Sequence, residues 1–237
     1  MKFENRVVIL TGAAGNLAGA IIQALRGSGA RLALFDHRKG RLAEMYPELA
    51  GDAHCLFVES VDLTDEIAVQ NGLDQVIDRF GQVDVLINAA GGYSGGKSLE
   101  ETTIDTWERM LDLNARTVFI TSRAVVPTMR NQGGGSIVNL GARPGIQGVK
   151  NAAAYSASKS AVLRLTESLS AEVKHDGIHV NAVMPGTIDT PQNREAMPDA
   201  NFDRWVEPAA IADVILFLAS DAARGIYGAL VPVYGAS

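Results

Sequence analysis

The sequence contains very little cysteine: Cys55 is the only one among 237 residues. One cysteine cannot form an internal disulfide, which is typical of a reducing compartment, so we expect a cytoplasmic protein. Cys55 begins the apolar run Cys55–Val58, and we interpret it as a small buried residue rather than a reactive thiol. A chain of this length can bury a full hydrophobic core without disulfides.

Long hydrophobic runs and clusters of positive charge are also absent. Apolar runs such as Val214–Ala219 are far shorter than the ~20 residues that span a bilayer, and the polar segment Met1–Arg6 does not resemble a secretion signal. With 21 basic and 27 acidic side chains, the formal net charge is −6. An acidic chain without a basic block is a poor candidate for binding nucleic acid or an anionic membrane, so we expect neither partner.

Short apolar runs alternate with helical patterns along the chain. This alternation predicts one doubly wound α/β domain over residues 1–237, with parallel strands and a ligand site at their carboxyl ends. We expect helices over residues 20–25, 38–50, 68–80, 103–130, 152–174 and 208–220, and irregular structure over 186–206. The expected strands are Val7–Leu10, Arg31–Phe35, Cys55–Val58, Val83–Asn88, Ser136–Leu140, Ile178–Met184 and Leu230–Tyr234.

Two features after the first two strands are typical of a dinucleotide site. The turn from Gly12 through Gly15, Asn16 and Leu17 would let a pyrophosphate approach backbone N–H groups at a helix N-terminus. Asp36 ends the second strand, 24 residues after Gly12, where a carboxylate can accept hydrogen bonds from both hydroxyls of an adenosine ribose. Such a carboxylate repels a 2′-phosphate and favours NAD over NADP, although the nearby Arg38 could bind a phosphate.

The next two strands end in further candidate residues. Asp62 and Leu63 could flank an adenine ring, but helix capping explains Asp62 equally well. The small residues of Asn88-Ala89-Ala90-Gly91 would let a flat dinucleotide lie against the end of the fourth strand, and the Asn88 amide could tie neighbouring loops together.

The strongest local signal is Tyr155-Ser156-Ala157-Ser158-Lys159. On a helix, Tyr155 and Lys159 share a face. An ammonium one turn away favours the phenolate and should lower the tyrosine pKa from its ordinary value near 10. A tyrosine tuned in this way is a suitable general acid or base beside a hydride transfer. We predict no metal site, because Asp176-Gly177 separates His175 from His179 and the other histidines have no ligand partners at useful spacing.

Taken together, these motifs resemble the short-chain dehydrogenase/reductase family over essentially the whole chain. The resemblance also rests on Asn114 and on Pro185-Gly186 followed by Thr190. It implies a seven-stranded parallel Rossmann sheet of order 3-2-1-4-5-6-7 with helices on both faces, a nicotinamide cofactor and a small-molecule substrate. It further implies that Tyr155 donates a proton, that Lys159 lowers its pKa and holds the nicotinamide ribose, and that Asn114 positions a water. Ile188 and Thr190 would hold the carboxamide.

The sequence departs from that family in two places. Asn16 and Ala18 stand where glycines are usual, and binding should survive one added methyl group at Ala18. Ala142 stands where the family places its catalytic serine, thirteen residues before Tyr155. Losing one oxyanion donor typically costs about 10²–10³ in rate, so either ketone reduction is impaired or the substrate does not need that hydroxyl.

The loops near the site also resemble those of the quinonoid dihydropteridine reductases. The similar segments are Ala90–Gly96, Leu140–Arg143 and Asp189–Arg194 continuing to Trp205. Those enzymes are similar in having alanine at the serine position, and the resemblance implies NADH and a quinonoid pterin, with Tyr93 stacking on a flat ring. We therefore expect an NADH-dependent reductase of this kind.

Two alternatives remain open. The first is a carbonyl reductase or alcohol dehydrogenase, similar to the 3-oxoacyl reductases, in which another hydroxyl such as Ser94 replaces the serine. The second is a non-catalytic dinucleotide-binding regulator, against which the retained Asn114, Tyr155 and Lys159 argue. Helix 152–173 is apolar on more than one stripe, and the family resemblance implies a homodimer or homotetramer formed through this helix and the one that contains Asn114.

Overall fold

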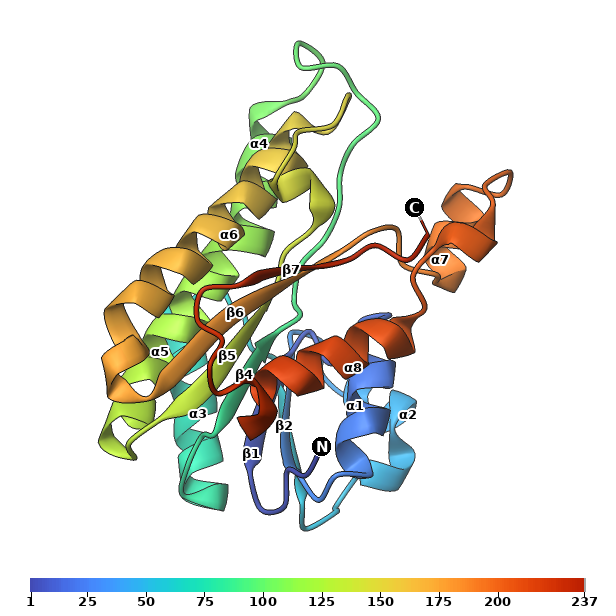
Figure 1. The fold of residues 1–237 in the computed structure, drawn as a ribbon. Helices are drawn as coiled ribbons and strands as arrows, with labels where there is room; N and C mark the ends of the chain where they lie inside the picture. The colour runs from blue at the N-terminus through green and yellow to red at the C-terminus, as the bar shows by residue number, and fades with distance from the viewer. Residues whose placement is uncertain (237) are drawn as a thin grey trace.

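The computed structural model describes residues 1–236 and contains one seven-stranded sheet (Figure 1). The strand order is β3-β2-β1-β4-β5-β6-β7, and all six pairings are parallel, which confirms the predicted topology. The strands are β1 (Val7–Thr11), β2 (Arg31–Asp36), β3 (Cys55–Glu59), β4 (Val85–Asn88), β5 (Gly135–Leu140), β6 (Ile178–Pro185) and β7 (Leu230–Val233).

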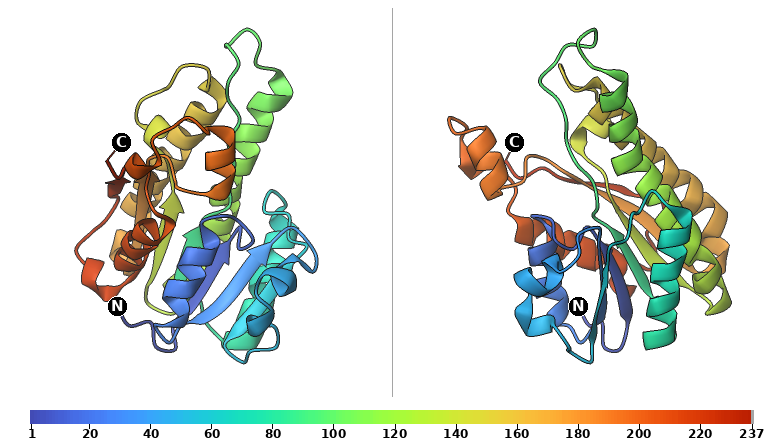
Figure 2. Two further views of the ribbon diagram at one scale, coloured as in Figure 1. Left: turned by 90° about the vertical axis from the view of Figure 1, so that its right-hand side faces the viewer. Right: turned by 180° about the vertical axis from the view of Figure 1, so that it is seen from behind.

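Helices cover both faces of the sheet (Figure 2). The central strands carry apolar side chains on both faces, so each face must be covered to be buried. Helices α1, α2 and α8 cover one face, and α3, α5 and α6 cover the other. The α-helices are α1 (Ala18–Arg26), α2 (Arg41–Met45), α3 (Glu66–Phe80), α4 (Ile104–Leu111), α5 (Thr117–Asn131), α6 (Ala153–Val173), α7 (Pro191–Ala196) and α8 (Pro208–Ala219).

The local sequence explains where several of these helices begin and end. In α1 the buried residues Ala18, Ile21, Ile22 and Leu25 follow the i, i+3, i+4, i+7 spacing of an apolar stripe. The Asp65 carboxylate accepts hydrogen bonds from the Ile67 and Ala68 N–H groups and caps α3. The amphipathic pattern therefore orients α1, and a side-chain cap fixes the start of α3.

Two expectations about helices were wrong. The helix expected over residues 38–50 is only α2, because Gly40 adopts φ +75° before it and Pro47 begins a separate 3₁₀ turn, Pro47–Leu49, after it. The helix expected over 103–130 is present as α4 and α5, joined without a break by a π-helical turn, Asp112–Arg116. The segment 186–206, expected to be irregular, contains α7 and a 3₁₀ turn.

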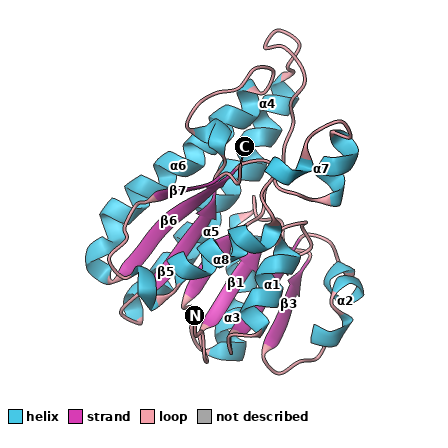
Figure 3. Ribbon diagram, turned by 45° about the vertical axis from the view of Figure 1, so that its right-hand side comes forward, coloured by secondary structure: helices cyan, strands magenta, loops and turns pink. Residues whose placement is uncertain are grey.

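Helices α4 and α7 both extend beyond the carboxyl ends of the strands (Figure 3). The loops that follow β1, β4, β5 and β6 meet at the same edge, so residues distant in sequence come together there. Among residues 1–236, no helix is both long enough and apolar enough to cross a membrane.

Candidate active site

The turn after β1 packs directly against the loop after β4. Thr11 Oγ1 accepts hydrogen bonds from the N–H groups of Ala89 and Ala90, each at 3.1 Å. Gly12 adopts φ +66°, and a Cβ at this position would lie 2.8 Å from Ala90 Cα. Only glycine allows this close approach, which brings the two predicted halves of the dinucleotide site together.

The same turn leads into an α1 N-terminus that no side chain caps. A Cβ on Gly15 would lie 3.0 Å from the Gly12 carbonyl oxygen, so the turn is tight. The Leu17 side chain is buried in the core, so only its backbone can face a ligand. Asn16 is exposed, and its Nδ2 donates to Gln192 Oε1 on α7 at 2.8 Å. The first turn of a helix has N–H groups without partners inside the helix, and together with the positive end of the helix dipole these fit a pyrophosphate here.

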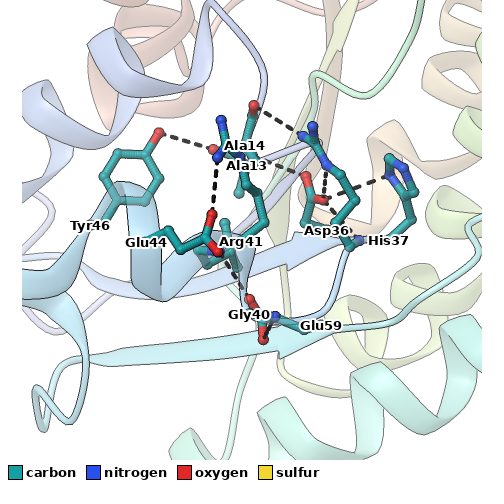
Figure 4. A network of polar contacts seen from close by, with 11 residues as sticks. Ala13, Ala14, Asp36, His37, Gly40, Arg41, Glu44, Tyr46 and Glu59 are labelled. Atoms are coloured by element: carbon teal, nitrogen blue, oxygen red, sulfur yellow. Dashed lines mark hydrogen bonds and ion pairs between the residues drawn. The ribbon is translucent and has the colours of Figure 1, made fainter.

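Asp36 is 3% exposed and lies beside the glycine turn (Figure 4). Its Oδ2 accepts from Ala14 N at 3.0 Å, and its Oδ1 accepts from Arg38 N at 3.0 Å and Arg38 Nε at 3.1 Å. Burial opposes the charge on Asp36, but the hydrogen bonds from Arg38 and Ala14 outweigh it and hold the carboxyl pKa below its ordinary value. Arg38 Nη2 also donates to Ala14 O. The carboxylate predicted to select NAD is therefore paired with the cation that could bind a phosphate.

Asp62 and Leu63 follow β3 near this end of the sheet. Asp62 Oδ1 accepts from the backbone N–H of Thr64 at 2.8 Å and from its hydroxyl at 2.7 Å. These two bonds lower the Asp62 pKa. Asp62 thus forms a local turn before α3, whereas Asp65 caps that helix, and Leu63 is buried.

The Asn88 side chain points into the protein rather than toward the strand edge. It is 2% exposed, its Nδ2 donates to Asn139 Oδ1 at 2.9 Å, and its Oδ1 accepts from the Thr121 hydroxyl at 2.8 Å. Asn139 Nδ2 in turn donates to Thr166 Oγ1 at 2.9 Å. The amide therefore ties β4 to β5, α5 and α6, and it supports the cofactor loop without facing it.

Tyr155 and Lys159 lie one turn apart on α6, as predicted, but the expected direction of the tyrosine pKa was wrong in this structure. The Lys159 ammonium is 4% exposed, and its Nζ donates to Leu140 O at 2.8 Å. Burial lowers the pKa of Lys159 to about 8. Burial, together with the Tyr93 phenol, raises the pKa of Tyr155 to about 12. The tyrosine is held protonated because its surroundings are apolar and the ammonium points to a carbonyl.

Asn114 is completely buried in the π-helical turn between α4 and α5. Its Oδ1 accepts from Gly92 N at 3.0 Å, and its Nδ2 donates to Gly92 O at 3.0 Å and to Ser158 Oγ at 3.0 Å. A Cβ on Gly91 would lie 2.7 Å from Asn114 Oδ1 and 3.4 Å from Lys159 Nζ. Asn114 and Lys159 therefore approach the same point in the loop after β4.

Ala142 lies on the loop after β5, and Tyr93 lies on the loop after β4 against Tyr155. Ala142 is 5% exposed in extended backbone just after β5. The ring of Tyr93 is 66% exposed and meets the ring of Tyr155 edge-on, with 4.9 Å between the centroids. Ser94, the suggested replacement hydroxyl, lines a separate hollow of about 100 Å³ with Lys97, Thr106 and the residues that begin α6.

The segment after β6 forms the other wall of this edge. Gly186 N donates to Val233 O at 3.0 Å, which fixes the turn after Pro185. Ile188 pairs with Val206, and its carbonyl accepts from Asn193 Nδ2 at 2.8 Å. Thr190 is 6% exposed and caps α7. Its Oγ1 accepts from Asn193 N, and its hydroxyl proton can still be donated to a ligand.

Sequence reasoning did not single out Ser158 or Gln192, although both touch candidate site residues. Ser158 lies within the Tyr155–Lys159 motif, which was the available signal, whereas nothing near Gln192 in sequence indicates a contact 176 residues away. Among residues 1–236, no three His, Cys, Asp or Glu side chains are placed to hold a metal ion.

The comparisons with known proteins agree with this geometry. A family model for the short chain dehydrogenases matches residues 6–201. The chain is 33% identical to meso-2,3-butanediol dehydrogenase of Serratia marcescens, over 99% of this chain and 95% of the relative, and 30% identical to the 3-oxoacyl-[acyl-carrier-protein] reductase of Thermotoga maritima, over 99% and 98%. The crystal structure of levodione reductase superposes with a TM-score of 0.90 at 31% identity, over 99% of this chain and 98% of that chain.

The chain belongs to the short-chain dehydrogenase/reductase family. It is therefore an NAD(P)-dependent oxidoreductase acting on a small molecule.

The buried ammonium predicts an unusual dependence of stability on pH. In the unfolded chain Lys159 titrates near 10.5, and in the folded protein near 8. Between these values the unfolded state binds more protons, so the Lys159 contribution to the free energy of unfolding rises with pH, by up to about 1.4 kcal/mol per pH unit. Urea unfolding between pH 7 and 9.5 should therefore show a steeper rise for the native protein than for Lys159→Met. Parallel curves would contradict the burial of the charge.

Proposed function

We propose that the protein is an NADH-dependent reductase in which Tyr155 donates a proton to the substrate. The observation that carries the proposal is the cluster of Tyr155, Lys159 and Asn114, which meets the loop after β4 at the carboxyl edge of the sheet. This cluster lies on the same edge as the uncapped N-terminus of α1. An intact proton-donating group beside a dinucleotide cradle argues for catalysis rather than for binding alone.

The chain's own residues suit the two ends of such a cofactor. Asp36 faces the position of an adenosine ribose, and the turn from Gly12 to Gly15 suits the pyrophosphate. Within residues 1–236 the Lys159 ammonium has one protein acceptor, Leu140 O, out of its three donors, so donors remain for ribose hydroxyls. Ile188 and Thr190 stand on the opposite wall, where a carboxamide would lie.

The chemistry then divides between the cofactor and the protein. When bound, NADH supplies the hydride. Tyr155 is protonated at neutral pH, as a tyrosine of ordinary pKa is, and can release its proton to the substrate as negative charge develops there. Lys159, with a pKa of about 8, is mostly protonated at pH 7, and from one helical turn away its charge is available to the phenolate once that forms. Asn114 holds the Gly92 backbone in place on the opposite side of this cluster.

We propose a planar conjugated substrate, with a quinonoid dihydropterin as the leading candidate. Ala142 provides no hydroxyl where an oxyanion donor is expected, which disfavours a substrate whose charge gathers on one oxygen. In a quinonoid pterin the charge spreads over several ring atoms and the ring gains stability on reduction. The exposed ring of Tyr93 beside Tyr155 offers a stacking surface for such a ring.

A second candidate is a carbonyl reductase or alcohol dehydrogenase. Two of the relatives, a butanediol dehydrogenase and a 3-oxoacyl reductase, favour it. Ser94 is a weak replacement for the missing serine, because the hollow that it lines is bounded by Thr106 and Ala153 rather than by Ala142. If this candidate is correct, Tyr155 alone must stabilise the developing oxyanion, or a different hydroxyl must approach it.

The proposed proton donor is tested by Tyr155→Phe. Phenylalanine keeps the ring and removes only the proton, so turnover should fall by at least about 10²-fold while the NADH dissociation constant changes little. Tyr227→Phe is the matched control, because this tyrosine stacks on His179 away from the site. Steady-state kinetics and fluorescence titration with NADH measure both quantities. Retention of most activity by Tyr155→Phe would show that the proton comes from another source.

The substrate class is tested by Ala142→Ser. We expect the native protein to reduce quinonoid dihydropterin much faster than simple ketones. The added hydroxyl should raise ketone reduction, by up to about 10²-fold where its oxygen reaches the substrate, and leave pterin reduction unaltered or lower. Steady-state kinetics on both substrate types, for both proteins, makes the comparison. Brisk native ketone reduction without a gain from serine would favour the carbonyl reductase instead.

The cofactor preference follows from Asp36. Its carboxylate is nearly buried and therefore little screened, so it should repel the 2′-phosphate of NADPH more than Arg38 attracts it. We expect NADH to bind at least about tenfold more tightly than NADPH, and Asp36→Ala to reduce that ratio. Calorimetric titration of both nucleotides with native, Asp36→Ala and Arg38→Ala protein measures it. Tighter native binding of NADPH would mean that Arg38 governs this site.

We further propose that the protein forms a homodimer or homotetramer through α5 and α6. A hollow of about 350 Å³ lies between these helices on the outer face, with Phe119, Val126 and Leu169 among its lining residues. Phe119 is 48% exposed, which is costly for a large apolar ring unless a partner covers it. A second copy, related to the first by a two-fold axis, would cover the apolar residues of both helices with the same surface.

Light scattering at micromolar concentration should therefore give a mass of at least twice 25.1 kDa. Phe119→Glu should shift the protein toward the monomer, because it buries a charge in the interface. The control is Ile67→Glu on α3, which replaces an exposed apolar residue outside the hollow and should leave the mass unchanged. A native mass of 25 kDa would refute the proposal.

A further inference from the structure

Ser158 joins two candidate catalytic elements that are far apart in sequence. Its side chain is completely buried on α6, three residues after Tyr155. Ser158 Oγ accepts a hydrogen bond from Asn114 Nδ2 at 3.0 Å and donates to the Tyr155 carbonyl oxygen at 2.8 Å. One hydroxyl therefore connects the π-helical turn of Asn114 to the backbone that carries Tyr155.

Only one of these bonds is expected of a serine in a helix. Serine hydroxyls commonly donate to a carbonyl three or four residues earlier, so the bond to Tyr155 O has a local explanation. The bond from Asn114 has none, because it joins residues 44 positions apart. Asn114 also lies where the helix departs from α geometry, and π-helical turns are frequent at functional sites. The amide must be held in one orientation for its Oδ1 to keep accepting from Gly92 N.

We propose that Ser158 is a positioning residue, which fixes the Asn114 amide and the Tyr155 backbone relative to each other for proton transfer. The inference rests on the proposed role of Tyr155. Without the hydroxyl, Asn114 Nδ2 loses an oxygen acceptor in a fully buried site, and the two bonds to Gly92 must then hold the amide without the link to α6. A displacement of about 1 Å in such a constellation costs on the order of 10²-fold in rate.

The test compares Ser158→Ala with Ser170→Ala. Ser170 is the matched control, because it is a buried serine on the same helix, about 18 Å further along it. Ser158→Ala should lower kcat about 10- to 100-fold, with KM and the NADH dissociation constant within about twofold of native. Ser170→Ala should leave kcat within about twofold of the native value, while it lowers Tm about as much as Ser158→Ala does. Ser158→Cys keeps the shape of the side chain with a somewhat larger atom and weakens both hydrogen bonds, so it should also lose kcat. It serves as the test if the alanine variant unfolds.

A double-mutant cycle shows whether Ser158 acts through Asn114. If it does, the kcat of Asn114→Ala combined with Ser158→Ala should match that of Asn114→Ala alone, whereas independent structural effects would multiply. A kcat for Ser158→Ala equal to that of Ser170→Ala, or losses that multiply in the double variant, would overturn the proposal. Activity retained by Tyr155→Phe would instead show that the proposed function fails, so the two failures are distinguishable.

Discussion

The buried ammonium of Lys159 is the constraint on which the rest of the site depends. A charge removed from water is unfavourable unless it is hydrogen-bonded, and the carbonyl of Leu140 at the end of β5 supplies that bond. The arrangement requires β5, α6 and the loop after β4 to meet at one point, where Gly91 leaves room for Asn114 and Lys159. Lowered stability at neutral pH is the expected consequence of placing a reactive cation there.

At the same edge of the sheet, the serine hydroxyl usual in the family is missing at Ala142, and the ring of Tyr93 is exposed. Ala142 leaves an apolar surface beside β5, while the Tyr93 ring packs edge-on against Tyr155. Both features favour a flat acceptor with delocalised charge over one that localises charge on a single oxygen. The framework common to the family thus remains, and in the proposed function the preference for a flat substrate rests on these two side chains.

The alternation of strands and helices, the sheet order and the Tyr155–Lys159 pair could be read from the sequence, because they depend on local periodicity and on a compact motif. The inward orientation of Asn88 could not, since it depends on Asn139 and Thr121 from other elements. The direction in which the Tyr155 pKa is shifted could not be predicted from the sequence either. Spacing places Lys159 on the same helix face, but only tertiary packing directs its ammonium to Leu140 and buries the phenol.

A crystal structure with NADH bound is the most direct test of the account. In that structure the adenosine ribose should lie against Asp36, and the pyrophosphate should lie against the turn from Gly12 to Gly15. The nicotinamide ribose should lie within hydrogen-bond distance of Lys159 Nζ. Tyr155 Oη should then face the carbon that releases the hydride across a space for the substrate. A nucleotide bound elsewhere, or a nicotinamide ribose out of reach of Lys159, would contradict the central claim.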